Sequence, residues 1–88
     1  RLYTIAADAG IPLAQYNLAM LTVTKHVIGD VTDPVERDRD MSIAYMWLTF
    51  ASEKGLTLAV ESRQELIEFM TPGALKSGKE QVQAKRGK

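Results

Sequence analysis

The strongest constraint on this chain of 88 residues is an internal repeat, which recurs after 45 positions. The segment TIAADAGIPLA, which begins at Thr4, returns as TFASEKGLTLA, which begins at Thr49. Identical Thr, Ala, Gly and Leu-Ala positions fall in register in the two segments. A period of roughly 20–50 residues is typical of stacked supersecondary units, so one structural unit is expected to occur twice.

Each copy of the repeat has the residues of a helix that stops at a glycine. Ala6 and Ala51 favour helix, and their small side chains let a second helix approach closely. Gly10 and Gly55 follow, and glycine tolerates the left-handed conformation that closes a helix C-terminus. Pro12 comes two residues after Gly10, where it suits the first turn of the next helix. We therefore predict a helix, a glycine stop, a short turn and a second helix in each copy.

Hydrophobic periodicity and capping signals extend this prediction to an all-α fold of about five helices. Gly29-Asp30 and Asp33-Pro34, with the charges around them, indicate a long loop. Asp40 is placed to cap the helix after that loop, and Thr71-Pro72 marks the start of the last helix. The predicted helices cover residues 2–9, 12–24, 41–54, 57–70 and 72–85, with the loop at residues 25–39. The helix at 41–54 is nearly apolar all round, so it should be the most buried element.

A spacing pattern in residues 40–59 identifies the repeat more closely. Its members are Asp40, Ala44, Trp47, Ala51-Ser52, Gly55 and Ala59. The first copy supplies Gly10 and Ala14, followed by Gln15, Tyr16, Asn17 and Leu18. These residues at these intervals resemble Sel1-like repeats, a family related to tetratricopeptide repeats. The resemblance implies antiparallel helix pairs stacked as a short α-solenoid, with the quoted residues as its structural motif.

The chain also departs from the family pattern. Leu2 stands in place of the usual Trp, and Ala19, Thr22 and Lys25 replace a Gly, a Tyr and a second Gly. The loop at 25–39 is longer than the family's. Residues 1–70 are therefore expected to form repeat helices with one expanded loop.

Residues 71–88 are predicted to form a C-terminal capping helix with a basic tail. This helix contains Gly73 and Gly78 and is expected to fray after Val82. A terminal repeat needs a polar outer face because nothing stacks on it, and the residues suited to that face are Glu61, Arg63, Gln64, Glu65 and Glu68. Since Arg1 begins in the middle of a repeat, we expect further repeats to precede it in a longer array.

The net charge is zero, but it is unevenly distributed, with −4 in residues 1–70 and +4 in residues 71–88. A basic tail can contact nucleic acid, but a solvated terminus is its more usual role, so no nucleic-acid partner is expected. No stretch approaches the ~20 apolar residues of a membrane-spanning helix. The family resemblance implies a bacterial protein of the cytoplasm or the periplasm.

The residues needed for catalysis or metal binding are sparse. The chain has no cysteine, and its one histidine, His26, is expected on the surface of the loop. A zinc site needs about three or four ligands, and the acidic cluster from Asp30 to Asp40 lacks the ligand spacing of a calcium loop. No motif pairs a nucleophile with a base. We therefore expect no cofactor, no metal and no enzymatic activity.

The function implied by the resemblance is non-catalytic protein binding or scaffolding, with another protein or peptide lying along a concave helical surface. Tyr16 and Tyr45 are the candidate partner-binding residues, since both are predicted to reach this face with wet hydroxyls. Trp47 and Phe50 are predicted to pack between helix pairs. The alternative is a fixed structural subunit or cap within a larger assembly, with the loop at 25–39 and the basic tail as its contacts.

Overall fold

The computed structural model describes residues 2–27 and 33–87, which form five helices and contain no strand. The helices are α1 (Leu2–Asp8), α2 (Pro12–Val27), α3 (Pro34–Glu53), α4 (Thr57–Phe69) and α5 (Pro72–Arg86). The predicted all-α class is therefore confirmed for the described residues. None of these helices is long and apolar enough to cross a membrane.

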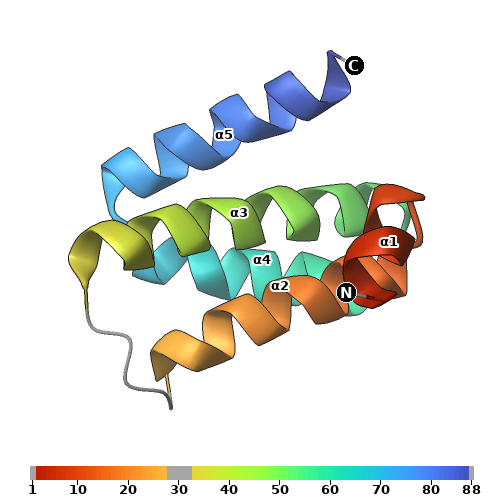
Figure 1. Ribbon diagram of the computed structural model, residues 1–88, viewed down its shortest axis with the longest axis horizontal. Coiled ribbons are helices and arrows are strands. Elements are labelled where there is room, and N and C mark those ends of the chain that lie inside the picture. Colours follow the sequence, from red (N-terminus) through yellow and green to blue (C-terminus); the bar gives the residue numbers. More distant parts are fainter. Residues whose placement is uncertain (1, 28–32, 88) are drawn as a thin grey trace.

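Helix α3 lies at the centre of the bundle. Helices α2, α4 and α5 all pack against it, and α1 packs against α2 (Figure 1). The segment from Asp40 to Ala51 in α3 is almost entirely buried. The prediction that this helix is the most buried element is confirmed.

The two predicted glycine stops are confirmed, and both close a helix in the same way. Gly10 and Gly55 have φ angles of 88° and 90°, in the left-handed region. The amide after each glycine donates to the carbonyl five residues back, at 3.1 Å after α1 and 3.3 Å after α3. This closure is the Schellman motif. Lys54 joins the two equivalent turns, because its Nζ donates to the Gly10 carbonyl at 2.6 Å.

Both predicted bounds of the loop at residues 25–39 are wrong, because helix occupies part of that range at each end. Helix α2 continues to Val27, and α3 already begins at Pro34. Asp33, rather than Asp40, caps α3, because its carboxylate accepts a hydrogen bond from the Val35 amide at 3.0 Å. An Asp cap followed by proline can start a helix whose first turns are charged and largely solvent-facing. Residues 28–32 of the predicted loop lie outside the described residues.

The start of α5 at Pro72 and its end at Arg86 agree with the predicted range of 72–85, and only the expected fraying is not observed. The Ala74 amide donates to Thr71 Oγ1 at 3.1 Å, and Pro72 occupies the first turn. The helix then runs to Arg86, so the fraying expected after Val82 is wrong. A Cβ at Gly78 would lie 2.7 Å from the ring of Tyr45 in α3. Glycine at this position therefore lets α5 approach α3 closely.

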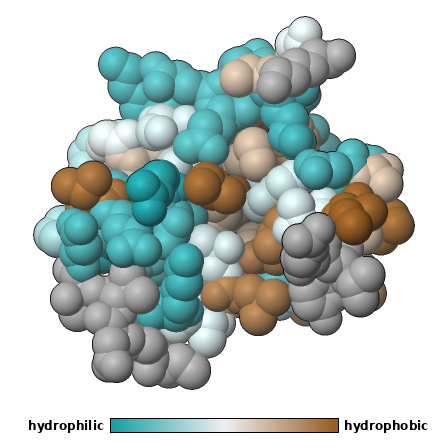
Figure 2. All heavy atoms as spheres, viewed as in Figure 1, coloured by the Kyte–Doolittle hydropathy of each residue, from teal (hydrophilic) through white to brown (hydrophobic). Residues whose placement is uncertain are grey.

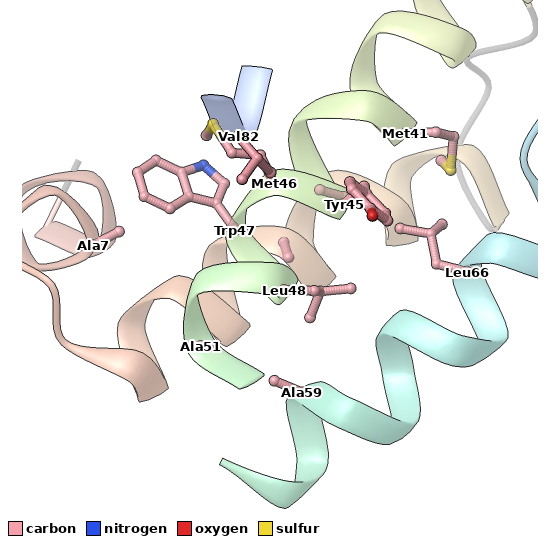
Figure 3. Packing of buried hydrophobic residues seen from close by; sticks show 12 residues of the cluster. Ala7, Met41, Tyr45, Met46, Trp47, Leu48, Ala51, Ala59, Leu66 and Val82 are labelled. Atoms are coloured by element: carbon pink, nitrogen blue, oxygen red, sulfur yellow. The ribbon is translucent and has the colours of Figure 1, made fainter. Parts of the chain in front are cut away.

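Small residues let the helices approach, and larger side chains fill the space between them. The buried alanines of the repeat motif are Ala14, Ala44, Ala51 and Ala59. Figure 3 shows Leu48 and Leu66 pointing into the space between α3 and α4, and Trp47 beside Val82 of α5. Trp47 also meets Phe50 edge to face, with ring centroids 6.4 Å apart. These contacts form one core around α3.

Candidate functional site

A groove of about 600 Å³ lies between α2 and α4, with α3 as its floor. Helices α2 and α4 both pack on α3, but in the described residues they approach each other closely at few points. The apolar side chains that line the space are Met20, Val23, Met41, Leu48, Leu66 and Phe69. This space is called the α2–α4 groove below.

The α2–α4 groove has a buried apolar floor and an exposed aromatic rim. Met41, Leu48 and Leu66 are buried, whereas Phe69 at the end of α4 is 71% exposed. Methionine is unbranched and flexible, so Met41 and Met20 can adapt the wall to the shape of an occupant. An exposed aromatic side chain beside an apolar groove is typical of an interaction surface.

His26 forms the polar end of the groove, and its hydrogen bond to Asp40 joins α2 to α3. His26 Nε2 lies 2.7 Å from Asp40 Oδ2, and Lys25 Nζ lies 3.2 Å from the same oxygen. The side chains of His26 and Asp40 are only 3% and 9% exposed. His26 lines the groove, whereas Asp40 lies behind it.

Asp40 carries its negative charge at neutral pH. Burial by itself would raise the pKa of this carboxyl group, but the hydrogen bonds from His26 and Lys25 and their charges outweigh burial. The pKa of Asp40 is therefore held below its ordinary value of 3.8. An ionised carboxylate only accepts hydrogen bonds, so the Nε2–H group of His26 is the donor.

The predicted positions of His26 and Asp40 are both wrong. His26 lies within α2 with a buried ring, and its Nδ1 has no hydrogen-bond partner among the described residues. Asp40 is a buried residue inside α3 rather than a cap. One signal in the sequence could have located it. Asp40 precedes the buried Ala44 by four residues, so the two share one face of the helix.

The rim of the groove near Phe69 is tied to the start of α3. Arg37 Nη2 donates to the Phe69 carbonyl at 3.4 Å. Thr71 Oγ1 donates to Asp38 Oδ2 at 3.1 Å and adds a second link at this end. Arg37 and Glu65 both line the groove, so charges of both signs face it.

Tyr16 and Tyr45, the predicted partner-binding residues, do not line the groove. Tyr45 is only 3% exposed, and its hydroxyl accepts a hydrogen bond from Arg63 Nη2 at 2.7 Å. The predicted wet hydroxyl is wrong because Arg63 of α4 binds it, while α5 packs against the base of the Tyr45 ring at Gly78. Tyr16 is half-buried against the core. A role of either tyrosine in partner binding stays a prediction.

Arg63 was expected on the polar outer face, but it packs inward instead. Its guanidinium lies 4.7 Å from the centroid of the Tyr45 ring, where a cation is attracted to the π face. Its Nε also donates to Thr49 Oγ1 at 2.9 Å. Arg63 therefore joins α4 to α3, and sequence pattern alone assigned it to the wrong face.

The basic residues at the end of α5 contact acidic residues of this chain. Lys85 Nζ lies 3.1 Å from Asp8 Oδ1 and 5.1 Å from the centroid of the Trp47 ring. Arg86 pairs with Glu53 at the end of α3. Exposed ion pairs such as these are individually weak. They nevertheless direct part of the positive charge of the tail toward α1 and α3.

The groove offers little for metal binding or nucleophilic catalysis. No group of three or more His, Cys, Asp or Glu side chains in residues 2–27 and 33–87 is arranged to hold a metal ion. Ser62 lines the groove, but the hydrogen bond of His26 goes to Asp40. A serine is a weak nucleophile unless a base activates it.

Comparison of this chain with protein-family models, with curated proteins and with solved structures gave no match. The resemblance to Sel1-like repeats therefore rests on the motif residues and their intervals.

Proposed function

We propose that this chain is a non-catalytic protein-interaction module of the Sel1-like repeat type, which binds an apolar helical segment of another protein in the α2–α4 groove. The observation that carries the proposal is the groove, in which six apolar side chains line about 600 Å³ between two helices. An amphipathic helix buries its apolar face in a space of this kind. Phe69, at the exposed rim, would pack against such a helix.

The polar groups of the groove support binding rather than catalysis. His26 bonds to Asp40, and Arg37 bonds to the Phe69 carbonyl, so both side chains serve to hold helices together. A catalytic site requires a nucleophile or an acid–base pair within reach of a substrate atom. The contacts of the described residues that line the groove contain no such pair.

Two features support a repeat array. The turns after α1 and α3 have the same closure and are joined by Lys54 and Gly10, as equivalent parts of stacked helix pairs would be. Helix α5 packs on α3, at the place where the first helix of a following pair would stack. Its outer face is mainly hydrophilic in Figure 2, which suits a terminal cap.

The groove can be tested with a displayed library of random peptides about four helical turns long, selected against the immobilised chain. The variant Phe69→Glu places a charge on the rim. The matched variant Val35→Glu places the same charge on α3, at a side chain that is 75% exposed and does not line the groove.

Selected peptides should bind Phe69→Glu at least about tenfold more weakly than the unmodified chain, and they should bind Val35→Glu unchanged. Amide NMR shifts should change along α2 and α4. Equal binding to both variants would exclude the groove as the site. Failure to select any peptide would count against the proposed function.

A fixed structural subunit or cap is the second candidate, and apolar side chains at the other end of the bundle favour it. Ile11 and Leu13 near the start of α2, and Leu58 and Val60 near the start of α4, are each at least half exposed. Helices α2 and α4 begin at the same end of α3 (Figure 1). A permanent neighbour would cover such side chains.

Sedimentation of the isolated chain separates this candidate from the first. If the apolar end belongs to a permanent interface, the chain should self-associate, and Leu13→Glu with Leu58→Glu should return it to a monomer. A chain that is monomeric at high concentration and binds no apolar dye would rule the second candidate out.

A further inference from the structure

We infer that the α2–α4 groove selects a helix with one Asp or Glu side chain at the Phe69 end, where this carboxylate pairs with Arg37. The inference rests on the proposed function, because it names the charge that the bound helix must carry and the place where it must carry it.

Arg37 brings a permanent positive charge to an accessible part of the groove. The residue is exposed, and its side chain lines the groove. Unlike the charge of a histidine, that of an arginine does not depend on pH in the range where proteins work. Arg37 lies at the end that Phe69 marks, since its Nη2 donates to the Phe69 carbonyl at 3.4 Å. A side chain of a helix in the groove can therefore reach this charge.

The acidic residues that precede and follow Arg37 in the sequence are engaged elsewhere. Asp33, one turn before it, accepts from a backbone amide at 3.0 Å, and Asp38 accepts from Thr71 Oγ1 at 3.1 Å. In the part of the chain that the structure describes, no ion pair involves Arg37. The contact with the Phe69 carbonyl uses one of about five N–H donors of the guanidinium. The other donors are available to a bound group.

A carboxylate is the group of a protein partner that matches this site. Guanidinium and carboxylate form two parallel hydrogen bonds, and such charged bonds are stronger than those between neutral groups. A helix that covers the apolar lining of the groove displaces water there, which reduces the screening of the pair. Within a helical segment, this group is the side chain of Asp or Glu.

Glu65 restricts where the carboxylate can lie. It also lines the groove, and it stands one turn before Phe69 on the same face of α4. An acidic side chain opposite Glu65 would be repelled, whereas one opposite Arg37 would be attracted. The groove therefore favours a helix with a single placed carboxylate over a generally acidic one.

The test compares two variants with the same change of charge on the same helix. Arg37→Glu reverses the charge at the groove, and Arg39→Glu reverses it at an exposed residue that does not line the groove. The displayed library is selected against the unmodified chain and against each variant, whose folds are checked by circular dichroism. Peptides selected by the unmodified chain and by Arg39→Glu should be enriched in Asp or Glu at one position. Those selected by Arg37→Glu should be enriched in Lys or Arg there.

One selected peptide is then synthesised with Glu or Gln at this position and with an amidated C-terminus, so that no terminal carboxylate competes. We expect the Glu peptide to bind the unmodified chain about fivefold more tightly than the Gln peptide at low salt. This preference should shrink at high salt and should be lost in Arg37→Glu. The ¹⁵N NMR signal of Arg37 Nε should move further with the Glu peptide than with the Gln peptide. This readout needs no variant, so the test holds even if Arg37→Glu fails to fold.

The absence of an enriched acidic position, or equal affinity of the Glu and Gln peptides, would overturn the inference and leave the proposed function standing. A preference for Glu that persists in a folded Arg37→Glu variant would also overturn it, because another cation would then bind the carboxylate. Amide NMR shifts along α2 and α4 show whether the peptides lie in the groove. If they lie elsewhere, the proposed function fails, and the inference with it.

Discussion

His26 of α2 and Asp40 of α3 form a buried hydrogen bond of 2.7 Å between Nε2 and Oδ2, and this bond joins two of the helices that build the groove. Removing the carboxylate leaves the Nε2–H group buried and unpaired, which costs roughly 1–3 kcal/mol. We expect Asp40→Ala to lower the free energy of unfolding by this amount in urea denaturation followed by circular dichroism. The exposed control Glu68→Ala should change it by less than about 0.5 kcal/mol, and equal effects of the two substitutions would contradict the prediction.

Because the pKa of the Asp40 carboxyl group is lowered in the folded chain, the free energy of unfolding should depend on pH. The pKa of Asp40 lies below its ordinary value of 3.8 in the folded chain, so the unfolded chain binds the proton first as the pH falls. Its stabilisation is therefore present above that ordinary value and is lost as the pH falls through the lower folded pKa. We expect the difference in unfolding free energy between the unmodified chain and Asp40→Asn to be larger at about pH 6 than at about pH 3. A difference that does not change with pH would refute this.

Gly55 and Gly73 form a matched pair for testing the glycine stops. A Cβ added at either position meets nothing within 4 Å, but only Gly55 has a positive φ, of 90°. Gly55→Ala should therefore destabilise the chain by about 1–2 kcal/mol. Gly73→Ala lies in helical backbone and should stabilise it by up to about 1 kcal/mol. Denaturant midpoints measure both changes, and shifts of the same sign would show that backbone conformation does not set the difference.

Gly78 tests how closely α5 must approach α3. A Cβ there would lie 2.7 Å from the Tyr45 ring, so Gly78→Ala should cost about 1–3 kcal/mol. Trp47 is the one tryptophan of the chain, and it packs beside Val82 and below Lys85 of α5. Its fluorescence should shift to longer wavelength as α5 moves away. Gly73→Ala is again the control, and an unchanged spectrum in Gly78→Ala would show that α5 accommodates the methyl group.

Helix ends could be predicted from the sequence wherever a few neighbouring residues decide them. The stops at Gly10 and Gly55 depend on one left-handed residue and the hydrogen bonds around it. The start of α5 depends on Thr71 and Pro72, which act within a single turn. The start of α3 was missed because its first turns are charged, and such a run shows no apolar periodicity. Asp33-Pro34 is the local signal that starts this helix, although the same residue pair is also common in loops.

The groove and its polar end could not be predicted in the same way. His26 and Asp40 are separated by 14 positions and belong to different helices, so their contact exists only when α2 packs on α3. The burial of Tyr45 likewise depends on α5, which reaches it at Gly78. A hydrophobic pattern shows which residues share a face of one helix, but it does not show which other helix covers that face.

The sequence by itself therefore determined the all-helical class, the repeated helix–glycine–helix unit, the two equivalent stops and the cap at Thr71. These follow from backbone preferences and hydrogen bonds within a few residues. Only the tertiary structure decided that α2 and α4 flank a groove on α3, that His26 is buried at its polar end, and that α5 covers Tyr45. Those outcomes depend on packing between helices that are distant in the chain, where shape and unpaired polar atoms select the arrangement.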